Sequence, residues 1–328
     1  MDILYIIGNG FDLNIGLRTS YTDFYNYYNS LECTKEKVKF LKESISKDYQ
    51  TWADLELGLG EFTEKLNNTE EFNEIFEDIS DQLATYLEKE ENSFDFSLID
   101  KEKFFSDLSF PEKYLPVVDL NVLQEYKNKW IKVHWNVRII TLNYTRSIEK
   151  ILNAENPDFQ IGTHPDSYQV NLKRIEHLHG YINERMILGV NDVSQIKNES
   201  FHNVQEIIEA MVKPSCNLAS GDTIDKACTR QIESADLICI FGCSIGDTDN
   251  TWWELIGNQL RRTVKLLIFT RGSEISRRRP YKRLPHERQI KKYFLDKTNL
   301  TDSEKESFSK NIFIGLNTDM FSHMRIQS

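Results

Sequence analysis

Residues 1–24, MDILYIIGNGFDLNIGLRTSYTDF, decide how this chain folds. Residues 3–7 are a run of apolar and aromatic side chains, rich in β-branched types and too short for a helix, so they predict a buried strand. Gly8-Asn9-Gly10 ends this strand. The residues that follow have the spacing of an amphipathic helix, with Leu13, Leu17, Tyr21 and Phe24 on its apolar side.

The loop at the end of this strand predicts a nucleotide site. A strand that stops at Gly-x-Gly and leads into a helix places backbone N–H groups where they face a phosphate. We therefore expect a nucleotide to be bound by Gly8, Asn9, Gly10, Phe11 and Asp12. The third glycine of the usual dinucleotide fingerprint is missing, and Asp12 would put a carboxylate where the pyrophosphate should lie. This argues against an ordinary dehydrogenase.

Further short apolar runs alternate with helical segments along the rest of the chain. We expect strands at residues 137–141, 175–180, 186–189, 236–241, 264–269 and 311–316. This alternation predicts an α/β fold with a doubly wound, mostly parallel, Rossmann-like sheet. Within it, residues 3–7, 137–141 and 236–241 should be parallel neighbours.

Residues 32–130 interrupt this pattern with Lys, Glu, Asp and Asn, and with Leu, Phe and Tyr at helical spacing. They predict a large helical insertion that caps the sheet, so that residues 1–31 and 131–328 form the nucleotide-binding α/β domain. Asp54 and Glu56 lie inside the insertion. Since they are two residues apart, their side chains would diverge on a helix.

Polar residues follow several strands, and the carboxyl ends of parallel strands are where such sheets bind ligands. We expect catalytic roles for Asn143 and His179, although Asn143 is also suited to capping the next helix. His177 and His179 should share a strand face, with His177 as a packing residue. After residues 236–241, a small-residue loop predicts ligand contacts from Gly242, Ser244 and Asp247, while Asp249 or Thr248 caps a helix.

These motifs resemble the AbiH family, bacterial proteins associated with abortive infection by bacteriophage. The resemblance rests on residues 8–24 and on the later motifs at residues 52–56, 141–145, 177–180, 188–192 and 241–249, so it covers nearly the whole chain. It implies a role in phage defence, with growth arrest of the infected cell, and a ligand role for Asp54 and Glu56. The order of Gly-rich loop, Thr-x-Asn, His-Gly and Gly-x-Ser is similar, more loosely, to sirtuin-like domains, which bind NAD. Phe11-Asp12 departs from the sirtuin pattern.

Composition limits the function and location. The net charge is −11, which disfavours nucleic acid as a partner, although residues 271–288 are a basic patch that suits either a solvated loop or the binding of phosphate or a partner. Five cysteines without a C-x-x-C pair argue against zinc and a disulfide framework. No stretch reads as a signal peptide or membrane span, so we expect a cytoplasmic protein without membrane contact.

Three functions of different classes stay open. In the first, the protein is an NAD(P)+ glycohydrolase that needs no metal: the glycine loops cradle the phosphates of NAD, Asn143 holds the ribose or a water, and His179 takes a proton. In the second, it is a nucleotide-binding sensor or toxin component that acts through a partner, with a phage-encoded trigger and a homo-oligomer as candidates. In the third, it is a metal-dependent nuclease whose ligands are His177, His179, Asp192, Asp247 and Asp249.

Overall fold

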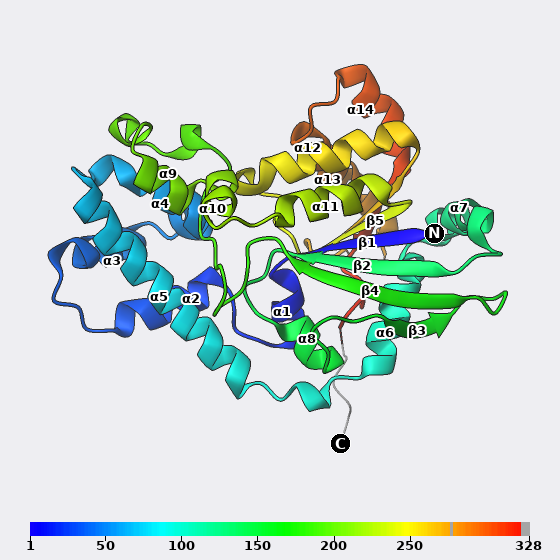
Figure 1. The fold of residues 1–328 in the computed structure, drawn as a ribbon. Helices are drawn as coiled ribbons and strands as arrows, with labels where there is room; N and C mark the ends of the chain where they lie inside the picture. The colour runs from blue at the N-terminus through cyan, green and yellow to red at the C-terminus, as the bar shows by residue number, and fades with distance from the viewer. Residues whose placement is uncertain (276–277, 323–328) are drawn as a thin grey trace.

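The computed structural model describes residues 1–275 and 278–322, and a seven-stranded sheet runs through its centre (Figure 1). Six strands are parallel, in the order β4-β2-β1-β5-β6-β7, and β3 pairs antiparallel with β4 at one edge. The strands are β1 (Asp2–Ile7), β2 (Trp135–Thr141), β3 (Phe159–Thr163), β4 (Gln169–His177), β5 (Leu237–Phe241), β6 (Lys265–Thr270) and β7 (Ile312–Leu316). The expected mostly parallel α/β sheet is therefore confirmed.

The first strand lies in the middle of this sheet, as predicted. Ile7 pairs with Thr141 of β2 on one side and with Phe241 of β5 on the other. The expectation that residues 3–7, 137–141 and 236–241 are parallel neighbours is confirmed. A central strand in a parallel sheet is buried on both faces, which explains why its sequence is apolar without alternation.

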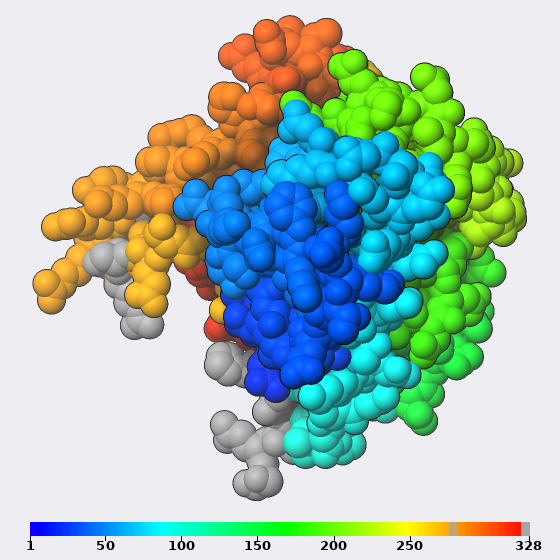
Figure 2. Space-filling view, turned by 90° about the vertical axis from the view of Figure 1, so that its left-hand side faces the viewer, coloured from blue at the N-terminus to red at the C-terminus, as the bar shows by residue number. Residues whose placement is uncertain are grey.

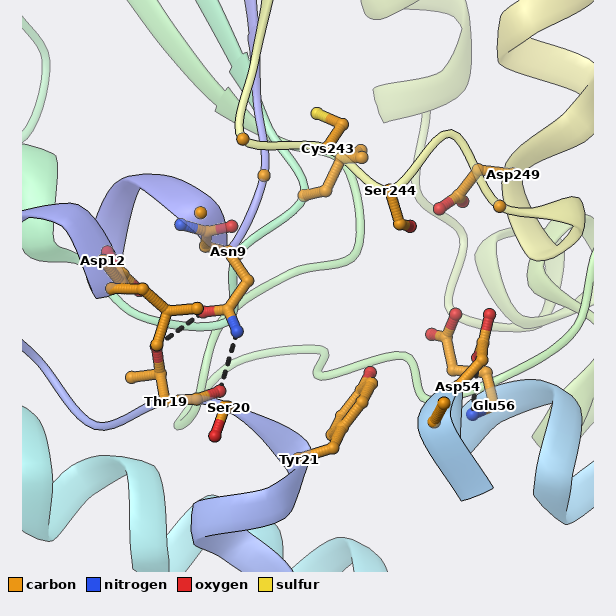
Figure 3. Close-up of a pocket in the computed structure, with 18 of the residues that line it drawn as sticks. Asn9, Asp12, Thr19, Ser20, Tyr21, Asp54, Glu56, Cys243, Ser244 and Asp249 are labelled. Carbon is orange, nitrogen blue, oxygen red and sulfur yellow. Dashed lines mark hydrogen bonds between the residues drawn. The ribbon is translucent and has the colours of Figure 1, made fainter. Parts of the chain in front are cut away.

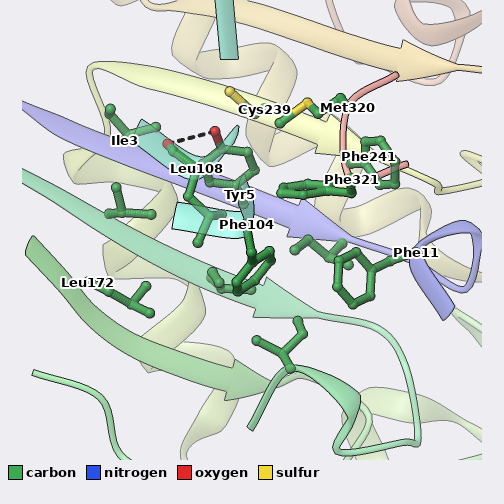
Figure 4. Packing of buried hydrophobic residues seen from close by; sticks show 14 of the residues in the cluster. Ile3, Tyr5, Phe11, Phe104, Leu108, Leu172, Cys239, Phe241, Met320 and Phe321 are labelled. Carbon is green, nitrogen blue, oxygen red and sulfur yellow. Dashed lines mark hydrogen bonds between the residues drawn. The ribbon is translucent and has the colours of Figure 1, made fainter. Parts of the chain in front are cut away.

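Helices cover both faces of the sheet. Ile3, Tyr5 and Ile7 pack into one core, and Leu4 and Ile6 into another on the opposite face. The first core, part of which is drawn in Figure 4, includes residues of α1 (Gly10–Ile15), α6 (Lys101–Ser109), α7 (Val117–Lys127) and α8 (Ser147–Leu152). The second includes residues of α11 (Ile224–Ser234), α12 (Asn250–Gln259) and α13 (Arg283–Asp296), and α14 (Asp302–Phe308) contacts it.

A helical cap with its own core lies beyond the carboxyl end of β1 (Figure 1). It consists of α2 (Tyr21–Ser30), α3 (Glu36–Lys47), α4 (Leu55–Phe62), α5 (Thr69–Ser93) and α9 (Gln205–Met211), followed by α10 (Lys213–Ala219). Residues 32–130 contain no strand and are mostly helical, as predicted. Their packing is divided, however, because α6 and α7 lie against the sheet while residues 188–212 complete the cap.

The prediction of a strand at residues 186–189 was wrong. Only Val190 forms an isolated bridge, with Val212, and Leu188 and Val190 pack into the cap core. The apolar character of this stretch therefore reflects burial under helices rather than a place in the sheet. The strand expected at residues 175–180 ends at His177, and β3 was not foreseen.

Candidate functional site

A cavity of about 980 Å³ lies where the loops after β1, β2, β5 and β6 meet the cap. Figure 3 shows Asn9 and Asp12 on one side and Asp54, Glu56 and Asp249 on the other, with Tyr21 and Ser244 between them. Nine of the residues singled out from the sequence line this cavity: Gly8, Asn9, Gly10, Asp12, Asn143, His179, Gly242, Ser244 and Asp247. The structure thus brings them together, while their roles in binding and catalysis stay predictions.

Phe11 is the exception among the predicted binding residues. Its side chain is fully buried in the core, where its ring packs edge-on against Phe321 with 5.4 Å between the ring centroids. It also contacts Phe104 and Phe241. Phe11 therefore anchors α1 to the sheet and does not line the cavity.

The glycines of the first loop bring it into contact with the loop after β5. The N–H groups of Gly8 and Gly10 donate to the carbonyl oxygens of Phe241 and Gly242, both at 2.9 Å, and that of Phe11 donates to Gly8. A Cβ on Gly10 would lie 2.5 Å from the Cα of Gly242, which has a φ of +67°. The absence of side chains lets the two loops touch. These three N–H groups are therefore already paired within the protein, while binding of a nucleotide by this loop stays a prediction.

Asn9 ties the first loop to the cap. Its side-chain amide donates to the carbonyl oxygen of Thr19 at 2.8 Å, and its Oδ1 accepts from the Thr19 hydroxyl at 2.6 Å. Thr19 immediately precedes Ser20, which caps α2. The side chain of Asn9 therefore fixes where the cap begins.

Asp12 is fully buried beneath the cavity. Its carboxylate accepts hydrogen bonds from the hydroxyls of Thr145 at 2.5 Å and Ser147 at 2.6 Å. Burial raises the pKa of Asp12 from 3.8 to about 6, against the opposing effect of these two hydroxyls and of Asn143. The carboxylate is turned toward α8, which explains how an acidic residue is accommodated in this loop.

Asp12→Asn should change how stability depends on pH. A pKa raised from 3.8 to about 6 contributes about 3 kcal/mol to the free energy of unfolding of the wild type. This contribution is fully present below pH 4, where the carboxyl is protonated in both states, and it is lost as the pH rises through 6. Between pH 5 and pH 8, the wild type should lose about 1.4 kcal/mol of unfolding free energy relative to the variant. Urea unfolding at both pH values measures this, with the exposed Asp166→Asn as control. Identical pH dependence of the wild type and Asp12→Asn would contradict the assignment.

Asn143 is the most unusual polar residue of the cavity. Its residue exposure is 6%, yet neither the oxygen nor the nitrogen of its amide has a hydrogen-bond partner among the described residues. It lies close enough to Asp12 to lower the pKa of that carboxyl. The predicted alternative, that Asn143 caps a helix, was wrong, because α8 begins after Arg146, whose N–H donates to Glu91. A buried amide without partners is costly, so Asn143 is suited to hold a ligand.

His179 belongs to a buried charge network at the other side of the cavity. Its Nε2 lies 2.9 Å from Asp249 Oδ1, and the same oxygen accepts from Lys213 Nζ at 2.8 Å. Lys213 also donates to Glu56 Oε2 at 2.8 Å. Although burial alone would raise it, the pKa of Asp249 is lowered by Lys213 and His179. Sequence analysis missed Lys213 altogether.

The predicted capping role of Asp249 was wrong, whereas the predicted ligand contact of Asp247 stays a prediction. Asp249 precedes α12 but makes no capping hydrogen bond with its side chain, because its carboxylate is paired with Lys213 and His179. Asp247 is exposed at the cavity edge and pairs with Lys297. Asp249 is therefore the buried carboxylate of this loop, which local capping preferences could not reveal.

Asp54 and Glu56 converge on the cavity, contrary to the expectation that they diverge. Asp54 has extended backbone and caps α4, its Oδ1 accepting from the N–H groups of Glu56 and Leu57 at 3.1 Å. Only Glu56 lies inside the helix, so helical spacing does not apply to the pair. Burial raises the pKa of Asp54, and Glu56 adds to this. Glu56 is held by Lys213 and by the hydroxyl of Tyr144 at 3.0 Å.

The ligands of the nuclease hypothesis do not converge. His177 bonds Glu149 at 2.7 Å and the carbonyl oxygen of Asn143 at 3.2 Å, so its ring contacts different groups from that of His179. Asp192 caps a short helical turn with the N–H of Ser194. Within residues 1–275 and 278–322, no three His, Cys, Asp or Glu side chains are arranged to hold a metal ion. The two histidines therefore do not form one site.

Comparison with known proteins gives one match. The family model described as bacteriophage abortive infection AbiH matches residues 4–270, which include every lining residue discussed above. No curated protein and no solved structure matches the chain. Among the helices that the structure describes, none combines the length and apolar character needed to cross a membrane.

Proposed function

The chain belongs to the AbiH family of bacteriophage abortive infection proteins, and on that premise we propose that it cleaves the N-glycosidic bond of a nucleotide such as NAD during infection. The observation that carries this proposal is Asn143, a buried amide at the cavity that lies near the Asp12 carboxyl but makes no hydrogen bond of good geometry to the described residues through either its nitrogen or its oxygen. A ribose hydroxyl is both donor and acceptor and would satisfy it.

The charge of the cavity supports this reaction. Asp12, Asp54, Glu56 and Asp249 line it, and the one cation of the inner network, Lys213, is shared between two of them. Cleavage of the bond to nicotinamide develops positive charge on the ribose, which neighbouring carboxylates stabilise. Carboxylates placed near the ribose therefore favour the transition state, in which positive charge moves from the nicotinamide ring onto the ribose.

The steps of the reaction balance with water as the second substrate. The bond between the ribose C1′ and the nicotinamide nitrogen breaks, and its electron pair neutralises the ring nitrogen. Water adds to C1′, and its proton passes to His179, whose Nε2 lies 2.9 Å from Asp249 Oδ1. Asn143 orients a ribose hydroxyl or the water. The products are nicotinamide, ADP-ribose and a proton.

The topology also supports a dinucleotide. The order β4-β2-β1-β5-β6-β7 of the parallel strands corresponds to the order of doubly wound sheets that bind dinucleotides at the reversal of strand order. Here the reversal lies between β1 and β5, whose following loops line the cavity. The volume of about 980 Å³ is at the upper end of the range for small-ligand sites.

The test is NAD turnover. Purified protein is incubated with NAD, NADP, ATP and nucleic acids, with and without divalent metal, and NAD is also measured in phage-infected cells that express the wild type or Asn143→Ala. We expect release of nicotinamide from NAD and a fall of cellular NAD after infection with the wild type only. Binding of NAD without nicotinamide release in either setting would contradict cleavage and favour the non-catalytic sensor.

A further inference from the structure

The phosphates of the proposed substrate need a binding element other than the glycine loop. The N–H groups of Gly8, Gly10 and Phe11 already donate to backbone oxygens, and α1 has only six residues. The inner cavity is lined with carboxylates, whose negative charge repels a pyrophosphate. A phosphate group is therefore excluded from the end of the cavity that holds Asp54, Glu56 and Asp249.

Arg271 places a positive charge, opposite to that of a phosphate, in the lining of the same cavity. It directly follows β6, and it is the one Arg or Lys whose side chain lines the cavity within the described part of the chain. Its guanidinium is exposed and donates to Asn14 Oδ1, an oxygen that also accepts from the Ser322 hydroxyl at 3.0 Å. Among residues 1–275 and 278–322, it forms no ion pair with a carboxylate.

The surroundings of Arg271 extend this positive charge. The following segment carries exposed Arg279, Lys282 and Arg288, whereas Arg277 of the predicted basic patch lies outside the described residues. Figure 2 shows residues 270–275 and 278–290, in gold to orange, projecting beside the blue N-terminal helices, with the surface hollowed between them. Leu13, Asn14, Thr270 and Thr318 line the cavity together with Arg271 at this end.

We propose that Arg271 binds the pyrophosphate of a dinucleotide at the cavity mouth, so that the glycosidic bond points inward to Asn143 and His179. This inference rests on the proposed function and adds a specificity determinant to it. The fork of a guanidinium matches phosphate oxygens in two parallel hydrogen bonds. Its contact with Asn14 keeps this group at the mouth before a ligand arrives.

The proposal predicts discrimination between NAD and nicotinamide riboside, which has the same glycosidic bond and no phosphate. Calorimetric titration measures binding of both to the wild type, Arg271→Ala and Arg230→Ala, an exposed arginine on α11 outside the cavity lining. Arg271→Ala should weaken NAD binding about 10- to 100-fold and change riboside binding less than about twofold. Arg230→Ala should change neither, and all three proteins should melt alike.

The outcomes separate this inference from the proposed function. Equal weakening of both ligands by Arg271→Ala, or no weakening of NAD, overturns the phosphate role, and nicotinamide release in the same samples shows whether cleavage still stands. If Arg271→Ala weakens the binding of NAD alone, and the wild type releases no nicotinamide, the phosphate role is supported and cleavage is rejected. Failure of the wild type to bind NAD overturns both.

Discussion

Lys213→Met should lower the free energy of unfolding by about 3–5 kcal/mol, the range found when one partner of a buried ion pair is removed. Lys213 is 5% exposed, and its Nζ lies 2.8 Å from both Glu56 Oε2 and Asp249 Oδ1. Although burial alone would lower it, these carboxylates raise the pKa of Lys213. Met fills a similar volume but leaves two buried carboxylates without their shared cation.

Urea unfolding at pH 7.5 measures this loss, with Lys47→Met as control. Lys47 pairs with Glu43 at 3.4 Å on an exposed face of α3, where such a pair contributes about 0.5 kcal/mol. The folded-state pKa of Asp249 is depressed below 3.8, so its stabilisation is full above about pH 4 and declines as the pH falls. The loss in Lys213→Met should therefore be smaller near pH 3. Similar losses for the two variants at pH 7.5 would show that the buried network stabilises nothing.

His179→Ala should reduce the turnover of NAD about 10²- to 10⁴-fold, the typical worth of a proton-transfer residue, with little change in KM. This expectation rests on the proposed function and on the position of the imidazole, which lines the cavity with Asn143 and contacts Asp249. Asp249 keeps Lys213 as a partner in the variant, so the fold should persist.

The control for His179 is His202→Ala. His202 is also partly buried, with its Nε2 at 2.7 Å from the carbonyl oxygen of Ile196, but it does not line the cavity. Its removal should leave turnover unchanged. Steady-state kinetics together with melting curves separate a loss of turnover from a loss of stability. A His179→Ala protein that melts like the wild type and retains full turnover would rule out proton transfer by this residue.

Most strands of the sheet were predictable because each of them is indicated by a short, continuous stretch of sequence. Residues 3–7 and 237–241 are apolar without alternation, and this alone indicates strands buried on both faces. The ends of neighbouring parallel strands meet at one edge, so the gathering of Asn143, His179 and Ser244 around one cavity follows from the same pattern.

The charge network was not predictable, since it is built from pairs distant in sequence. Lys213 and Glu56 are 157 residues apart, and the residues around Lys213 show no motif that points to a buried cation. The same holds for the glycine loop, whose N–H groups are paired with Phe241 and Gly242. From sequence alone, Gly8 and Gly10 look free to meet a ligand, because their partners come from a loop more than two hundred residues later.

The central position of β1 determines the order in which the protein can complete itself during synthesis. This strand leaves the ribosome before its two neighbours, which begin only at Trp135 and Leu237. At roughly 5–20 residues per second, one edge of the strand waits on the order of 6–25 s for β2, and the other about twice as long. Throughout that interval, the nascent chain carries an unpaired apolar strand, which is prone to pair with other chains. The cavity is complete only once residues up to Thr318 have emerged, so an unfinished chain lacks part of its lining.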